Sequence, residues 1–414
     1  MDPLSSCVDW SDEALAIGWS LRDCARQALG GEAIVWLKPG EAVSPAARPA
    51  TLGPHLYAGA TGIALFLAAL GHLREDEEMR DLALRALTPL RRQLARLAGD
   101  PAEIDRPRLD VGGLVGLGSF IYVLVRTGGW LREPSLIAEA CDVASWITDE
   151  RIEQDTELDV MKGSAGAILS LLLLEREAPS ILAGRADPLG RAAACGEHLL
   201  RRGIPQEGGS RGWPRDGRGP GCGFAHGASG ISCALARLAE RTQRDDFRRA
   251  ALEGLAFEKL CYCPDQKNWR SSLHMPQPRM TAWCNGAPGI ALGRLGIAGL
   301  GQEGGETHGE ILTALETTRH ATPAQLDCVC CGNAGRAEVL LQAARKMSHA
   351  GYLAGARELA SGVVARTASR GVHSRVRRGG VLAKPGFFNG IAGIGYTFLR
   401  LSSPADLPCV LALE

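Results

Sequence analysis

The stretch with the clearest chemical potential is "DCVCCGNAGRAEVLL", residues 327–341, where three cysteines fall within four positions before an apolar helical pattern. A similar stretch, "AWCNGAPGI", carries Cys284 earlier in the chain. In a reducing compartment, clustered thiols are more often metal ligands or nucleophiles than disulfides. One cysteine from one loop and two from the next suit tetrahedral zinc, and three protein ligands leave the fourth position open. The cysteines therefore predict a catalytic zinc site.

The residues leave a second arrangement open. Cys328 lies in the same stretch as Cys330 and Cys331, and together with Cys284 these thiols could form a closed, structural four-thiolate site. Placement favours the three-ligand site, because Cys331 directly precedes Gly332 whereas Cys328 is further from that glycine. Whether Cys328 takes part stays open at this point.

A histidine and an aspartate occupy comparable positions. His226, in "GCGFAHGASG", directly precedes Gly227, and Asp159 stands four residues before Gly163. Histidine titrates near neutral pH and can act as a general acid or base. An aspartate beside it could orient the imidazole and support its cationic form, although aspartate near a helix start is also a common cap. We expect both residues at the cysteine site.

A repeat explains how these residues come together. The pattern glycine, two residues, glycine, followed by an apolar run, occurs seven times, starting at Gly59, Gly113, Gly163, Gly227, Gly286, Gly332 and Gly390. Between the copies lie amphipathic stretches whose apolar positions recur at three and four, as expected for outer helices with one wet face. Each repeat is therefore predicted to be a helical hairpin, with an apolar inner helix and an amphipathic outer one.

The last repeat is as apolar as the middle ones, whereas an open solenoid would end in a polar capping repeat. The last hairpin should therefore close on the first. The prediction is an all-α fold: a closed α/α toroid of seven hairpins and about 14 helices, forming one domain over residues 1–414.

Composition excludes several partners. The chain of 414 residues has 46 basic and 46 acidic side chains and a formal net charge of zero, so general attraction to nucleic acid or anionic membranes is not expected. Neither a signal peptide nor an apolar run long enough to span a membrane is evident. We expect a cytoplasmic protein.

Five stretches together resemble the motifs of the lanthionine synthetase C-like cyclases: "LYAGATGIALFLAAL", "LDVMKGSAGAILSLLLL", "GFAHGASGI", "AWCNGAPGI" and "CCGNAGRAEVLL". The resemblance is greatest to the C-terminal cyclase domain of class II lanthipeptide synthetases. It implies an α/α toroid that binds one zinc ion and cyclises a dehydrated precursor peptide. In that reaction, a peptide cysteine thiol adds to the β-carbon of dehydroalanine or dehydrobutyrine and forms a thioether ring.

Carried over position by position, the resemblance assigns the zinc ligands to Cys284, Cys330 and Cys331. It makes His226 the acid/base residue, without deciding which role it takes, and Asp159 its hydrogen-bonding partner. Arg279 lies near the position of a functional arginine in the family. Asn285 departs from the tyrosine or histidine that commonly follows the first zinc cysteine.

Nothing in the sequence resembles a dehydratase, so we expect a separate dehydratase to supply the substrate. Two other function classes are alternatives to the zinc-dependent cyclase. A non-catalytic, zinc-containing scaffold of the same fold could bind peptides without reaction. Glycoside hydrolysis would need two carboxylates flanking the bond, and of the candidate residues only Asp159 lies near the start of an inner helix.

Overall fold

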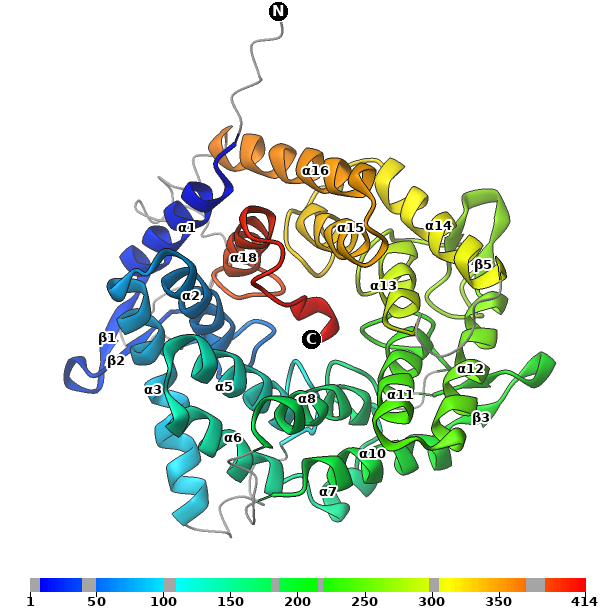
Figure 1. Ribbon diagram of the computed structural model, residues 1–414, viewed down its shortest axis with the longest axis horizontal. Coiled ribbons are helices and arrows are strands. Elements are labelled where there is room, and N and C mark those ends of the chain that lie inside the picture. The colour runs from blue at the N-terminus through cyan, green and yellow to red at the C-terminus, as the bar shows by residue number, and fades with distance from the viewer. Residues whose placement is uncertain are drawn as a thin grey trace, which may run out of the picture.

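The computed structural model describes residues 8–38, 50–99, 109–179, 186–214, 219–297, 305–369 and 384–414. Within them, seven helices form an inner ring and seven form an outer ring around it (Figure 1). The inner helices are α2 (Ala60–Arg74), α5 (Leu117–Leu131), α8 (Ser164–Glu177), α11 (Ala228–Thr242), α13 (Ala287–Ile297), α15 (Asn333–Met347) and α18 (Ile391–Ser402). The outer helices are α1 (Trp10–Cys24), α3 (Glu77–Gly99), α6 (Pro134–Ser145), α10 (Pro188–Arg202), α12 (Asp245–Leu260), α14 (Gly305–His320) and α16 (Ala350–Ser369). A short helix, α7 (Asp149–Glu153), lies between α6 and α8.

The ring is closed. Each inner helix packs against the next one, and α18 of the seventh hairpin packs against both α1 and α2 of the first. An inner helix therefore has neighbours on several sides, which is why α2 buries every residue from Ala60 to Gly71. An outer helix such as α3 buries only the apolar face of its amphipathic pattern. The predicted α/α toroid of seven hairpins and its closure are confirmed.

Three small antiparallel hairpins extend the outer layer, and the sequence reasoning did not predict them. They pair β1 (Arg26–Ala28) with β2 (Ala33–Val35), β3 (Ile204–Pro205) with β4 (Arg211–Gly212), and β5 (Tyr262–Cys263) with β6 (Asn268–Trp269). Each follows an outer helix and turns through a short 3₁₀ segment: η1 (Leu29–Gly31), η2 (Glu207–Gly209) or η3 (Pro264–Gln266). Strands of two or three residues are too short to show an alternating apolar pattern.

The second glycine of each pair is required by close backbone approach. At Gly166, Gly230 and Gly335, a Cβ would collide with the carbonyl oxygen of the residue six positions earlier, and the same holds in three other repeats. The second repeat departs from the predicted register. There Gly116, with φ of 145°, is the N-cap of the inner helix. The second repeat therefore begins at Gly116, three residues after the predicted start at Gly113.

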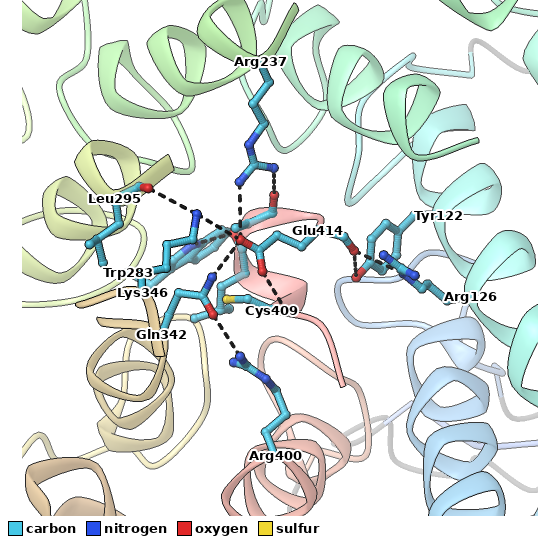
Figure 2. Close-up of polar contacts among 12 residues, drawn as sticks. Tyr122, Arg126, Arg237, Trp283, Leu295, Gln342, Lys346, Arg400, Cys409 and Glu414 are labelled. Carbon is cyan, nitrogen blue, oxygen red and sulfur yellow. Dashed lines mark hydrogen bonds and ion pairs between the residues drawn. The ribbon is translucent and has the colours of Figure 1, made fainter. Parts of the chain in front are cut away.

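The segment Cys409–Glu414, which includes the 3₁₀ turn η4 (Val410–Ala412), lies in the middle of the ring (Figure 1). Figure 2 shows that Glu414 is surrounded by side chains from several inner helices. Its main-chain oxygen accepts hydrogen bonds from Tyr122 and Arg126 of α5, at 3.2 and 3.1 Å. Its carboxylate accepts one from Gln342 of α15, at 2.7 Å. The C-terminal segment thus enters one end of the barrel and is held there by the inner helices.

In the parts of the chain that the structure describes, no helix combines the length and the apolarity needed to cross a membrane.

Candidate functional site

Three predicted cysteines meet at the end of the barrel where the inner helices begin. The Sγ of Cys331 lies 3.7 Å from that of Cys284 and 3.3 Å from that of Cys330. Among the described residues, this is the group of three possible metal-ligand side chains whose donor atoms all lie within 4.8 Å of one another. Thiolates at about 2.3 Å from a tetrahedral zinc ion would be roughly 3.8 Å apart. The donor types and their spacing therefore fit zinc.

Hydrogen bonds among the thiols make Cys284 more acidic and the other two cysteines less acidic. Donation from Cys330 and Cys331 lowers the pKa of Cys284 to about 4. The hydrogen bond with Cys284 in turn raises the pKa of Cys330, and it raises that of Cys331 to about 11. The Cys284 thiolate is thus stabilised by hydrogen bonds from the thiols of Cys330 and Cys331. Losing the other two protons requires a positive charge close to the sulfurs, which a divalent cation would supply.

Two buried asparagines fix the loops that carry the cysteines. Asn268 donates to the carbonyl of Met280 at 3.0 Å and accepts from the N–H of Ala287 at 2.8 Å, so it bridges both ends of the Cys284 loop. Asn333 does the same for the other loop by donating to the carbonyl of Leu326 at 3.1 Å. These bonds satisfy backbone groups of the two loops and hold the cysteines in place.

The structure places His226 beside Asp159, as predicted. The imidazole Nδ1 donates to Oδ2 of Asp159 at 2.7 Å, and the aspartate side chain is only 1% exposed. The other oxygen, Oδ1, accepts from the N–H of Lys162 at 2.8 Å, so Asp159 both caps its loop and orients the histidine. With Nδ1 held, Nε2 is the nitrogen that can exchange a proton with a ligand. The His226 side chain is 35% exposed.

His226 also lies close enough to the cluster to affect it. The pKa of Cys331 is set mainly by the hydrogen bonds among the cysteines, by burial and by the charge of Cys284. His226 is near enough that a positive charge on its ring would lower this pKa. The predicted ligands and the predicted acid/base pair therefore belong to one site.

Two neighbours of the cysteines had been given no role from sequence. The Tyr57 hydroxyl donates to the Sγ of Cys330 at 3.1 Å, and the Asn285 side chain donates to the sulfur of Cys284. A signal for Tyr57 was available: it stands two residues before Gly59, just as Cys284 and Cys330 stand two residues before Gly286 and Gly332. Equivalent positions of a closed repeat face the same axis.

An aromatic layer supports the site. Tyr57 stacks on Phe388 with ring centroids 5.4 Å apart, and Phe388 packs on Trp283 at 4.9 Å. Trp283 in turn packs on Phe224 at 5.9 Å. Trp283 directly precedes Cys284, and its indole N–H donates to the carbonyl of Leu411 at 3.1 Å. One aromatic residue from each of four repeats thus links the site to the C-terminal segment.

Two other candidates lie apart from the cluster. Arg279 is exposed and lines a hollow shared with Thr281, Arg336 and residues of α14, and none of the three clustered cysteines lines that hollow. A catalytic role for Arg279 stays a prediction. Cys328 is half-buried and falls outside the group of three sulfurs, in agreement with the three-ligand arrangement.

The sequence profile of the family described as "Lanthionine synthetase C-like protein" matches residues 50–412. The chain belongs to the lanthionine synthetase C-like family. This confirms the family that the sequence motifs indicated. The structure resembles that of "Nisin cyclase" with a TM-score of 0.64 and 17% identity, covering 87% of this chain and 92% of that one. This family member thus shares the toroidal fold of the cyclase.

A weaker likeness joins the chain to an unsaturated glucuronyl hydrolase from Bacillus sp. GL1. Its TM-score is 0.45 and its identity 14%, over 76% of this chain and 85% of that one. No curated protein matches this family member in sequence.

Proposed function

We propose that the protein is a zinc-dependent lanthipeptide cyclase. It would add a cysteine thiol of a precursor peptide to dehydroalanine or dehydrobutyrine in the same peptide and so form lanthionine or methyllanthionine. The observation that carries this proposal is the convergence of three cysteine sulfurs within 4.8 Å, beside a hydrogen-bonded pair of His226 and the buried Asp159, in a chain of this family.

The metal would be one zinc ion per chain, held by Cys284, Cys330 and Cys331. When bound, zinc supplies a Lewis acid that favours the deprotonated form of a substrate thiol near neutral pH. Tyr57 and Asn285 donate hydrogen bonds to two of the three cysteine sulfurs. These donors disperse negative charge at the sulfurs without adding a positive charge.

The net reaction moves one proton. The thiol S–H bond breaks, sulfur bonds to the β-carbon, and the electron pair of the alkene moves to the α-carbon and its carbonyl. A proton delivered to the α-carbon then completes the thioether. His226, with Nδ1 bound to Asp159, can accept the thiol proton at Nε2 and return it to the α-carbon. Asp159 stabilises the imidazolium formed in between.

The substrate sets further requirements. Because the reaction consumes dehydrated serine or threonine residues, a dehydratase has to act first, and we propose that it is a separate protein. A cytoplasmic location suits the site, because reducing conditions keep a cluster of three cysteines available for metal.

The proposal is tested by metal content and thioether formation together. Wild type, Cys284→Ala and the control Cys328→Ala, which makes the same change at a cysteine outside the cluster, are analysed by mass spectrometry for zinc. Each is then incubated with a dehydrated peptide that contains one cysteine. A thiol-alkylating probe reports unreacted cysteine. Wild type and Cys328→Ala should hold about one zinc per chain and protect the peptide thiol by cyclisation. Cys284→Ala should do neither.

Zinc that persists in Cys284→Ala would disprove the site. Stoichiometric zinc in wild type without any thioether would instead select the non-catalytic peptide-binding scaffold.

A further inference from the structure

The cysteine cluster opens into a hollow of about 490 Å³. Cys330, Cys331 and Tyr57 all line this hollow, so it is continuous with the proposed catalytic centre. Apolar side chains supply much of the remaining wall: Ile17, Leu326, Ile391 and Ile394. A hollow of this volume with largely apolar walls is typical of sites that bind small organic ligands.

Leu326 is the unusual member of this wall. Its side chain is 58% exposed, more than any other large apolar side chain among the described residues. The loop beneath it is fixed, because the Leu326 carbonyl accepts hydrogen bonds from both the main-chain and the side-chain N–H groups of Asn333, at 3.1 Å each. A large apolar group held in water at the rim of a hollow is typical of a surface that a ligand covers.

The charged groups of the wall neutralise each other in part. Arg366 donates to both oxygens of Asp327, with the shortest contact at 2.6 Å, and the Asp327 side chain is 12% exposed. This pairing cancels much of the charge next to Leu326, and the other charged residue of the wall, Lys384, is exposed. An uncharged, apolar side chain matches the surface better.

We infer that this hollow binds an apolar side chain of the precursor peptide, on a residue next to the cysteine that is cyclised. The inference rests on the proposed function. A peptide whose thiol reaches the three cysteines brings its adjacent residues within one or two Cα spacings of about 3.8 Å. The hollow begins at Cys330 and Cys331 themselves, so a neighbouring leucine, isoleucine, valine or phenylalanine side chain can enter it. The hollow would thus select which cysteines of a precursor react readily.

The test uses binding of unreactive peptides, so it does not depend on catalysis. Two fluorescein-labelled pentapeptides, Ser-Leu-Cys-Leu-Ser and Ser-Asn-Cys-Asn-Ser, share the thiol but contain no dehydrated residue. Fluorescence anisotropy with the protein as purified should give a Kd about tenfold lower for the leucine peptide. Leucine and asparagine are similar in size, so the comparison isolates polarity.

Leu326→Asp should reduce this preference to about twofold or less, because it places a charge at the rim of the hollow. Leu29→Asp is the matched control: it makes the same change at a leucine that is 45% exposed in the β1–β2 turn, away from the site, and should keep the tenfold preference. Equal affinities of wild type for the two peptides, or an unchanged preference in Leu326→Asp, would overturn the inference.

Failure of the proposed function would look different. In that case, the dehydrated forms of both peptides would stay uncyclised while the leucine preference in binding persisted.

Discussion

The two ends of the inner barrel differ in charge, and the helices explain why. All seven inner helices begin at the cysteine end, and none of them has an acidic residue in its first turn. At the other end, six of the seven carry arginine, lysine or histidine in the last turn. A helix has a partial positive charge at its N-terminus and a partial negative charge at its C-terminus. The cysteine end therefore favours anions, and the opposite end favours cations.

The ends also differ in where the balancing charge comes from. At the far end, the chain provides both signs: the Glu414 carboxylate lies 3.7 Å from Arg237 and 3.6 Å from Lys346 (Figure 2). At the cysteine end, the sulfurs receive hydrogen bonds from two neutral side chains, Tyr57 and Asn285. Full deprotonation there needs a cation from outside. The chain thus supplies the balancing charge at the far end itself, whereas at the cysteine end a ligand has to supply it.

The largest effect is expected from Asp159→Asn at the cysteine end. The amide keeps an oxygen for the Lys162 N–H but can no longer fix the proton on Nδ1 of His226, so the cyclisation rate should fall about 10²- to 10⁴-fold while zinc content stays unchanged. Single-turnover cyclisation assays measure this. Glu157→Gln, an acid-to-amide change in the same loop, is the control. Activity of Asp159→Asn within threefold of wild type would show that the pair only caps the loop.

Breaking the charge balance at the far end should give the largest loss of stability. Arg400 is fully buried and forms an ion pair with Glu338, so Arg400→Met leaves a buried carboxylate without its partner. We expect the free energy of unfolding in urea to fall by about 3–5 kcal/mol, and the double variant with Glu338→Met to recover most of it. The exposed pair of Arg191 and Asp149 is the comparison, where Arg191→Met should cost less than about 1 kcal/mol. A double variant as unstable as the single one would contradict this account.

A pH-dependent effect should follow from Glu414. Burial alone would raise its pKa, but Arg237, Lys346 and Arg400 outweigh burial and hold the pKa below its usual value of 4.5. A lowered pKa contributes stability that is present above the unfolded-state value and is lost as the pH falls through the folded-state value. Glu414→Gln should therefore be less stable than wild type by about 2 kcal/mol at pH 7, and the difference should shrink below pH 4.5. A difference that stays constant with pH in urea unfolding would show that charge is not its cause.

The smallest effect concerns the neutral donors at the cysteine end. Tyr57→Phe removes the hydroxyl that donates to Cys330 and should weaken zinc binding about tenfold. Competition with a chromophoric chelator measures the affinity. Tyr262→Phe, in the β5–β6 hairpin, is the matched control and should not change it. An unchanged affinity in Tyr57→Phe would mean that the hydrogen bond does not help to balance the sulfurs.

Much of the architecture and part of the site could be predicted because both follow from the repeat. Seven glycine pairs with apolar sequels predict the hairpins, and the apolar last repeat predicts closure. Cys331 and His226 each directly precede the first glycine of their repeat, and Cys284 stands two residues before its own. These residues converge because they occupy nearly equivalent positions of the repeat. Residues at equivalent positions of the sequence repeat therefore lie close together in the folded ring.

The parts that escaped prediction do not follow from the repeat. The hydrogen bond from Tyr57 to Cys330 joins the first and sixth repeats. It depends on how the first repeat packs against the seventh, and the spacing of the repeats along the sequence does not determine that packing. In the second repeat, the crowded glycines of "VGGLVGLG" hid the true register, because several of them could have been the helix cap.

The contact between Tyr57 and Cys330 has a consequence for how the protein is made. Its two residues are 273 positions apart, in the first and sixth repeats, and Phe388 of the seventh lies against the Tyr57 ring. A chain emerging from the ribosome can stack its hairpins one after another through local contacts, but it cannot assemble this contact until almost all of it has been synthesised. The contact between Tyr57 and Cys330 therefore belongs to the last stage of folding, and so would the loading of the zinc ion that we propose for this site.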